Sequence, residues 1–284
     1  MIARVRLRVI LILVMGATAA SACGGGGASG RESVVASFYP LAFAAEQIGD
    51  GRVDVRNLTP PGAEPHDLEV SPKDVAAIHD ADLVLLLGRG FQPQLEDAAG
   101  TGPNVLRLLD TPRLDVHANG DPHVWLDPLR YAKVVMRIGR ALGNDQAAAA
   151  LVARLHALDA EYRRGLTNCK RHDIVTSHEA FAYLAERYGL RQIAITGLSP
   201  EAEPQPGDLA RVVALARERG VTTIYFETLV SPRIAETVAR ETGARTAVLD
   251  PIEGLTKDEV SHRENYFTRM RANLRALRAG LGCR

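Results

Sequence analysis

The sequence predicts an α/β protein with two lobes, each a parallel sheet flanked by helices, joined by a long rigid helix. Short β-like runs alternate with amphipathic stretches in the first half of the chain, and the same alternation restarts in the second half. Between the halves, residues 128–166 show helical periodicity with one break at 143–145. At 284 residues, the chain is long enough for two compact domains.

We expect the N-terminal lobe at residues 33–127. Leu83–Leu87 is continuously apolar, which is typical of a strand buried on both faces, and Pro72 stands where a helix would begin. Strands are expected at 34–37, 53–58, 83–87 and 105–109, with helices at 41–48 and 71–79.

The helical connection is expected at 128–168, where an Ala-rich stretch continues to Tyr162 and is long enough to link two lobes. The C-terminal lobe, at 169–284, repeats the alternation of the first. Its strands are expected at 173–176, 192–196, 222–226 and 246–249, and its helices at 179–188, 208–219, 232–241 and 261–279.

The composition is that of an ordinary globular protein, with 46% hydrophobic and 24% charged residues. The formal net charge is zero, so composition gives no reason to expect binding to nucleic acid or to an anionic membrane. We expect a monomer that binds no nucleic acid.

The first residues have the pattern of an export signal. Three arginines precede a short apolar run at 9–14, and small residues then lead to Cys23. Small residues directly before a cysteine resemble a bacterial lipoprotein signal, so we expect residues 1–22 to be removed and Cys23 to carry lipid. Residues 23–32 would then be a flexible tether to the outer face of the bacterial cell membrane. The alternative is an ordinary secretory signal cut near Ala22.

The cysteine count is consistent with export. The chain has three cysteines, and lipidation of Cys23 would leave Cys169 and Cys283 in an oxidising compartment. We expect these two to form a disulfide that holds the C-terminus to the second lobe. Two free buried thiols are the alternative.

Three histidines, His66, His123 and His178, each follow a strand or strand-like run, although more than fifty residues separate them along the chain. Ligands of open α/β sheets bind beyond the carboxyl ends of the strands, so these loops should meet at one rim, in a cleft between the lobes. Imidazole suits zinc, and three imidazoles with one oxygen complete a tetrahedral shell. The remaining histidines lack this placement; they are His79, His117, His156, His172 and His262.

Two carboxylates are candidates for the fourth position. Asp250 follows the expected strand 246–249, and we predict it to be the ligand; a turn or capping role is the alternative. Glu227 follows strand 222–226 and is expected to orient a ligand or, failing Asp250, to replace it. His117 lies close enough in sequence to His123 to help recruit metal, a question that the sequence leaves open.

Five segments carry a resemblance to a known family. They resemble the site loops and later segments of the solute-binding lipoproteins of zinc and manganese ABC importers, in order and over nearly the whole chain after the signal. The resemblance implies two α/β lobes joined by a rigid helix with metal in the cleft, and a membrane permease as partner. The segments are 60–74, 121–128, 175–181, 226–232 and 249–255.

The third of these loops usually carries His in zinc members and Glu in manganese members, so His178 implies the zinc branch. Many zinc members have a long His-rich loop before the second site loop, where this chain has only Val116–Gly120. We therefore expect a non-enzymatic protein that captures Zn²⁺ and delivers it to the permease. A manganese carrier, a zinc hydrolase and a surface adhesin indifferent to metal are the alternatives; the hydrolase would need an open metal position.

Overall fold

Two four-stranded sheets form the framework of the protein, and every pair of neighbouring strands runs parallel. The first sheet has the order β2-β1-β3-β4 and the second the order β6-β5-β7-β8, so the two share one topology. This confirms the predicted pair of α/β halves. The strands are β1 (Glu32–Ala36), β2 (Val53–Asn57), β3 (Leu83–Leu86), β4 (Val105–Arg107), β5 (Asp173–Thr176), β6 (Arg191–Ala194), β7 (Thr223–Phe226) and β8 (Arg245–Val248).

The computed structural model describes residues 31–284, which form one compact unit. The predicted signal peptide and Cys23 lie outside the described residues. No helix within residues 31–284 combines the length and apolar character needed to cross a bilayer.

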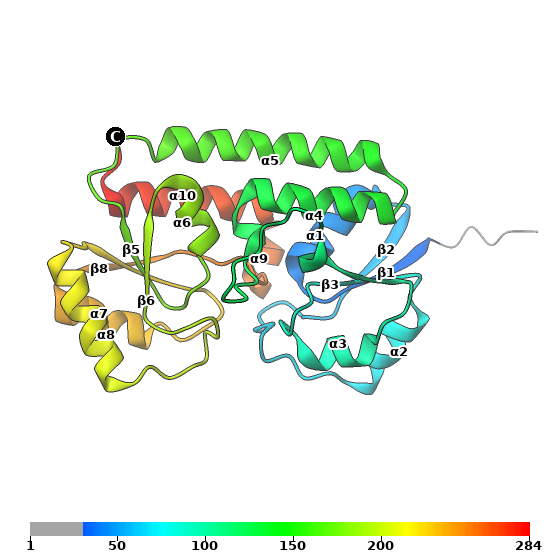
Figure 1. Ribbon diagram of the computed structural model, residues 1–284, viewed down its shortest axis with the longest axis horizontal. Helices are drawn as coiled ribbons and strands as arrows, with labels where there is room; N and C mark the ends of the chain where they lie inside the picture. Colours follow the sequence, from blue (N-terminus) through cyan, green and yellow to red (C-terminus); the bar gives the residue numbers. More distant parts are fainter. Residues whose placement is uncertain (1–30) are drawn as a thin grey trace, which may run out of the picture. The chain divides into compact units, whose positions relative to one another are not determined.

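Helices cover both sheets and connect them (Figure 1). The longest, α5, has 21 residues and would span about 31 Å at ~1.5 Å per residue. It packs along α4 and contacts both α1 and α10, so it reaches elements of both lobes. The helices are α1 (Tyr39–Gly49), α2 (Pro72–Asp80), α3 (Pro93–Ala99), α4 (Pro128–Ala141), α5 (Asp145–Gly165), α6 (Ala182–Tyr188), α7 (Pro206–Glu218), α8 (Arg233–Thr242), α9 (Lys257–Ser261) and α10 (Tyr266–Leu281), with 3₁₀ turns η1 (Leu108–Asp110) and η2 (Val124–Leu126).

Successive residues of a strand point to opposite faces of its sheet, and here both faces are buried. In β1, Val34 and Ala36 enter the large core, whereas Val35 enters a smaller core under α2 and α3. In β5, Ile174 enters the large core and Val175 a core under α7 and α8. Burial on both faces explains the continuous apolar runs of the sequence.

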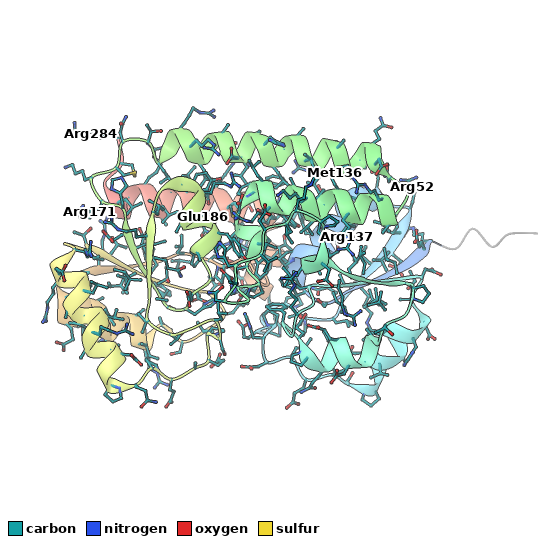
Figure 2. The ribbon with its side chains drawn as sticks, viewed as in Figure 1. Arg52, Met136, Arg137, Arg171, Glu186 and Arg284 are labelled. Carbon is teal, nitrogen blue, oxygen red and sulfur yellow. A yellow bond between two sulfur atoms is a disulfide. The ribbon has the colours of Figure 1, made fainter. Side chains whose placement is uncertain are left out.

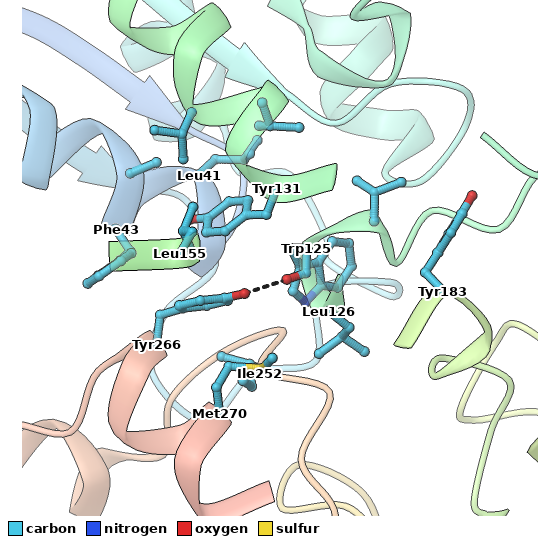
Figure 3. Packing of buried hydrophobic residues seen from close by; sticks show 14 of the residues in the cluster. Leu41, Phe43, Trp125, Leu126, Tyr131, Leu155, Tyr183, Ile252, Tyr266 and Met270 are labelled. Carbon is cyan, nitrogen blue, oxygen red and sulfur yellow. Dashed lines mark hydrogen bonds between the residues drawn. The ribbon is translucent and has the colours of Figure 1, made fainter. Parts of the chain in front are cut away.

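The large core is shared by the two lobes. Trp125 and Tyr131, which precede and begin the helical connection, pack near Tyr266 and Met270 of α10 (Figure 3). The Tyr266 hydroxyl donates to the Trp125 carbonyl at 2.7 Å. The two lobes therefore meet through apolar contacts and a buried hydrogen bond as well as through α5.

Two local predictions need correction, and a short helix was not predicted. The last helix does not begin at Ser261, because Ser261 ends α9 and Asn265 caps a new helix from Tyr266 onward. The helix expected at 179–188 begins only at Ala182, so His178 does not stand at its start. Helix α3 was not predicted, since its short sequence contains little apolar periodicity.

The structure contains the predicted disulfide between Cys169 and Cys283, just beyond the end of α10. Two backbone hydrogen bonds flank it, from Arg171 to the Leu281 carbonyl and from Arg284 to the Asn168 carbonyl. Arg171 and Arg284 mark this end of the molecule in Figure 2. The C-terminus is therefore held against the segment that leads into β5.

Candidate metal centre

Four side chains from four separate loops converge on one point. His66, His123, His178 and Glu253 each offer one ligand atom, and these atoms all lie within 4.8 Å of one another. The loops follow β2, η1, β5 and β8, so strands of both sheets position the cluster. The structure thus brings the three predicted histidines together, and it adds a carboxylate from the loop in which Asp250 lies.

The spacing of the four atoms suits a single tetrahedral ion. Glu253 Oε1 lies 3.2 Å from His66 Nε2, 2.9 Å from His123 Nε2 and 3.6 Å from His178 Nε2. The Nε2 atoms of His123 and His178 are 3.3 Å apart. Ligands bound at about 2.0–2.1 Å on a tetrahedron would lie about 3.3 Å from each other. The cluster therefore has the dimensions of a zinc shell before any large rearrangement.

Both fully buried histidines are oriented through their second ring nitrogen. His123 Nδ1 lies 2.7 Å from Asp121 Oδ1, and His178 Nδ1 lies 2.7 Å from Glu227 Oε1. A carboxylate at Nδ1 fixes the proton there and leaves Nε2 free for a metal. Asp121 also accepts from the His123 backbone at 3.0 Å, which makes the local turn rigid. Glu227 therefore has the position of the orienting partner that we expected. It is hydrogen-bonded to His178 and is not itself a member of the cluster.

His66 is held differently. Its ring stands edge-on to Phe91, with ring centroids 4.7 Å apart, and its backbone N–H donates to Glu64 Oε1 at 3.1 Å. Its side chain keeps 12% exposure, whereas those of His123, His178 and Glu253 have none. His66 is therefore the member of the cluster that touches solvent.

Asp250, the predicted fourth ligand, does not join the cluster. Its Oδ1 accepts from the Ile252 backbone at 2.7 Å, and its Oδ2 accepts from Arg269 Nε at 2.9 Å. Both oxygens are thereby committed, and Asp250 stabilises the loop rather than facing the histidines. Glu253, three residues later, stands in the place that we expected Asp250 to take.

The conformation of Ile252 explains why the sequence did not reveal Glu253. Ile252 has φ +58°, a left-handed conformation that costs an L residue about 1–2 kcal/mol and that a β-branched residue rarely adopts. This bend directs the next side chain, Glu253, toward the histidines. A glycine at this position would have signalled the bend, but an isoleucine does not.

The site combines an anionic carboxylate with two histidines whose pKa values are raised. Burial opposes charge on Glu253, but hydrogen bonds from the three histidines outweigh it and hold its pKa well below the usual range. Burial likewise opposes charge on His178, but Glu227 and Glu253 raise its pKa to about 10. The pKa of His123 is also raised, by Asp121 and Glu253 against burial.

Glu64 behaves in the opposite way. Burial and the nearby charge of Glu253 raise its pKa to about 9, so it is a neutral acid at neutral pH. A neutral Glu64 avoids a second uncompensated anion beside Glu253. In the metal-free protein, Glu253 is therefore the charged carboxylate on the Nε2 side of the histidines.

His117 lies outside the cluster. Its Nε2 lies 3.1 Å from Glu186 Oε2, and its ring stacks on Tyr183 with centroids 4.0 Å apart. Its Nδ1 is 3.8 Å from Asp121 Oδ2, so it neighbours a residue that orients His123. His117 therefore lies beside Asp121 and is not a member of the cluster.

Similarities to known proteins agree with this geometry. Residues 34–280 match the family model described as zinc-uptake complex component A, periplasmic (ZnuA). The chain is 36% identical over 280 residues to the zinc-binding lipoprotein AdcA of Streptococcus pneumoniae serotype 4, covering 88% of this chain and 56% of AdcA. It therefore spans about half the length of that relative. It is 35% identical over 278 residues to the high-affinity zinc uptake system protein ZnuA of Bacillus subtilis strain 168, covering 87% of each chain.

Solved structures give the same result. The Zn(II)-bound ZnuA-like domain of Streptococcus pneumoniae AdcA superposes with a TM-score of 0.75 at 35% identity, covering 89% of this chain and 99% of that domain. The laminin-binding protein Lmb of Streptococcus agalactiae gives a TM-score of 0.81 at 33% identity, covering 88% and 99%. Since the family model spans most of the chain and both sheets, the protein belongs to the family of the periplasmic zinc-uptake complex component A.

Proposed function

We propose that the protein captures Zn²⁺ outside the cytoplasm and hands it to the permease of an ABC importer. The observation that carries the proposal is the spacing of three imidazole nitrogens and one carboxylate oxygen as the ligands of a single tetrahedral ion. His66, His123, His178 and Glu253 would hold the zinc, and Asp121 and Glu227 would orient two of the histidines. Lipid on Cys23 would keep the protein at the outer face of the bacterial membrane, as a monomer.

The donor set favours zinc over manganese. Three nitrogens and one oxygen suit zinc, whereas manganese prefers oxygen-rich sites and a higher coordination number. Glu253 would also fill the fourth position, in which a hydrolase would hold the water that it activates. A zinc hydrolase is therefore the weaker candidate, and the family is one of uptake components.

The experiment is a titration of the metal-free full chain with Zn²⁺ and Mn²⁺ in competition with a chelator of known affinity. We expect one zinc per chain and an affinity for zinc at least ~100-fold above that for manganese, in line with the Irving–Williams order. Transport is tested by deleting the gene and measuring growth in zinc-depleted medium with and without the cloned chain. Equal affinity for the two metals would contradict the proposal. So would equal growth in zinc-depleted medium with and without the gene.

Adhesion is a second candidate because of one specific similarity. Lmb of Streptococcus agalactiae is described as a bifunctional protein with adhesin and metal-transporting activity, and it shares this fold at 33% identity. Binding of immobilised laminin by the purified chain, with and without zinc, tests whether this chain has both properties.

A further inference from the structure

The loop that carries Glu253 is fastened at both ends to one face of helix α10. Arg269 Nε donates to Asp250 Oδ2 at 2.9 Å, at the start of the loop. Arg269 Nη1 lies 2.9 Å from Glu259 Oε1, and the other Glu259 oxygen accepts from the Thr256 backbone at 2.8 Å, at the end of the loop. A single arginine therefore bridges the two ends of the segment in which Glu253 lies.

A second α10 side chain holds the same loop. Asn273, one helical turn after Arg269, accepts from the Asp250 backbone N–H at 2.9 Å and donates to the Asp250 carbonyl at 2.6 Å. Because Asp250 Oδ1 also accepts from the Ile252 N–H, every polar atom of Asp250 is hydrogen-bonded within the protein. Asp250 and Asn273 are each 1% exposed, so water does not compete for these bonds.

The same helix also fixes the segment of His123. Tyr266 of α10 donates to the Trp125 carbonyl, and Trp125 Nε1 donates to the Pro251 carbonyl at 2.7 Å (Figure 3). Trp125 thus ties the turn after His123 to the loop before Glu253. Two of the four ligands are set relative to each other through α10.

The backbone of this loop has a reason to need such support. Ile252, directly before Glu253, is held at φ +58°, which an isoleucine leaves when nothing constrains it. Rotation of Ile252 back to an extended or right-handed conformation would swing Glu253 away from the histidines. Asp250 Oδ1 accepts the Ile252 N–H and so acts directly on the strained residue.

We propose that Arg269 is a positioning residue of the metal site, acting through Asp250 to hold Ile252 in its left-handed conformation and Glu253 in reach of the ion. Arg269 touches no ligand atom itself. Its contribution is to keep the four ligand atoms in place before the metal binds. A preformed shell favours a metal that prefers tetrahedral coordination over one that tolerates irregular coordination. This inference rests on the proposed zinc binding and adds residues that govern it.

The test compares two arginines of one helix. Arg269→Gln removes the link to Asp250 and Glu259, and Arg271→Gln removes a two-bond pair with Glu161 at 2.8 Å that does not touch the loop. We expect Arg269→Gln to weaken zinc binding roughly 10- to 100-fold, as the loss of partners that orient ligands does. Arg271→Gln should stay within about twofold of the unmodified protein. Equal affinities of the two variants would overturn the inference.

Two further readouts separate positioning from a general loss of stability. Co²⁺ bound at saturation in place of zinc should show an altered visible spectrum in Arg269→Gln, because a carboxylate has left or shifted, and an unaltered one in Arg271→Gln. In a Glu253→Ala background, which has no oxygen ligand at this position, Arg269→Gln should cause little further loss of zinc affinity, since Arg269 acts through Glu253. An unaltered spectrum, or the same loss in both backgrounds, would refute the positioning role.

Folding failure of Arg269→Gln has a remedy, because the unpaired Asp250 carboxylate can be neutralised too. The triple variant Asp250→Asn, Glu259→Gln, Arg269→Gln neutralises both carboxylates that pair with Arg269 and should fold, yet bind zinc at least ~10-fold more weakly. Unmodified zinc affinity in the folded triple variant would contradict the inference. Failure of the unmodified protein to bind zinc would instead refute the proposed function, so the two outcomes are distinguishable.

Discussion

For His123 and His178, the carboxylate bound to Nδ1 determines which ring nitrogen is available to a metal. Asp121 and Glu227 occupy the Nδ1 side of His123 and His178, so both rings present Nε2 to Glu253 and to each other. The sequence predicted these three histidines because each follows a strand end. It did not predict Glu253, because the bend at Ile252 depends on contacts with α10 that no local pattern records.

Replacement of one ligand should weaken zinc binding without unfolding the chain. We expect His66→Ala, His123→Ala, His178→Ala and Glu253→Ala each to reduce zinc affinity by roughly 10-fold or more, because a closed shell loses a member. Chelator competition on each purified variant measures the change. His156→Ala, on the exposed side of α5, is the control and should bind normally. Unchanged affinity in all four site variants would contradict the assignment.

Zinc binding should depend on pH over a wider range than a free imidazole would give. With the pKa of His178 at about 10, this ring carries a proton at neutral pH that zinc must displace. Affinity should therefore rise from pH 6 to pH 9 and fall toward pH 5, with proton release measurable by calorimetry in buffers of different ionisation heat. A flat profile would contradict this expectation.

The same shift has a consequence for the metal-free protein. A histidine whose pKa is raised on folding stabilises the fold fully below its unfolded pKa of about 6.5, and this contribution is lost as pH rises toward the folded value. Metal-free protein should thus lose stability between pH 7 and pH 10. Thermal melting at several pH values, with the zinc-loaded form beside it, shows whether zinc removes the dependence.

Among the elements, those with clear periodicity were predicted and the irregular ones were not. The break near 143–145 and the helices on either side were predicted and are present, since both have apolar faces and defined ends. Helix α9 was not predicted, because its five residues give no period, and the last helix was started too early at Ser261, because the cap at Asn265 looks like any polar loop residue. The ends of α9 and α10, which hold the loop of Glu253, were therefore the hardest to predict from the sequence.

The disulfide should stabilise the second lobe and leave the metal site unaffected. Cys169 and Cys283 are separated by 114 residues, and such a link is worth roughly 2–4 kcal/mol. The double variant Cys169→Ala, Cys283→Ala should lose about that much free energy of unfolding in denaturant titration. Its zinc affinity should be unchanged, because the bridge lies beyond the opposite end of α10 from Tyr266 and Arg269. A weakened affinity in the folded variant would show that the bridge also shapes the site.

The molecule as a whole is joined by its core. The large cluster includes side chains of β1 and β3 as well as of β5, β7 and α10, so neither lobe buries its inner face alone. We expect residues 31–284 to unfold in one transition, with circular dichroism and Trp125 fluorescence changing together. Two separate transitions would show that the lobes are independent. Zinc should raise the midpoint in proportion to the logarithm of its free concentration above the dissociation constant.

The burial of the four clustered side chains has a kinetic consequence for metal exchange. Because three of the four side chains have no exposure and the fourth has 12%, an ion can enter or leave only while the loops move apart. The loading rate should therefore reach a plateau as zinc concentration rises, at the frequency with which the site opens. Stopped-flow mixing at increasing zinc concentration measures that plateau. The residence time of the ion is then set by the protein's own motion, and a partner that holds the loops apart would shorten it without competing for zinc.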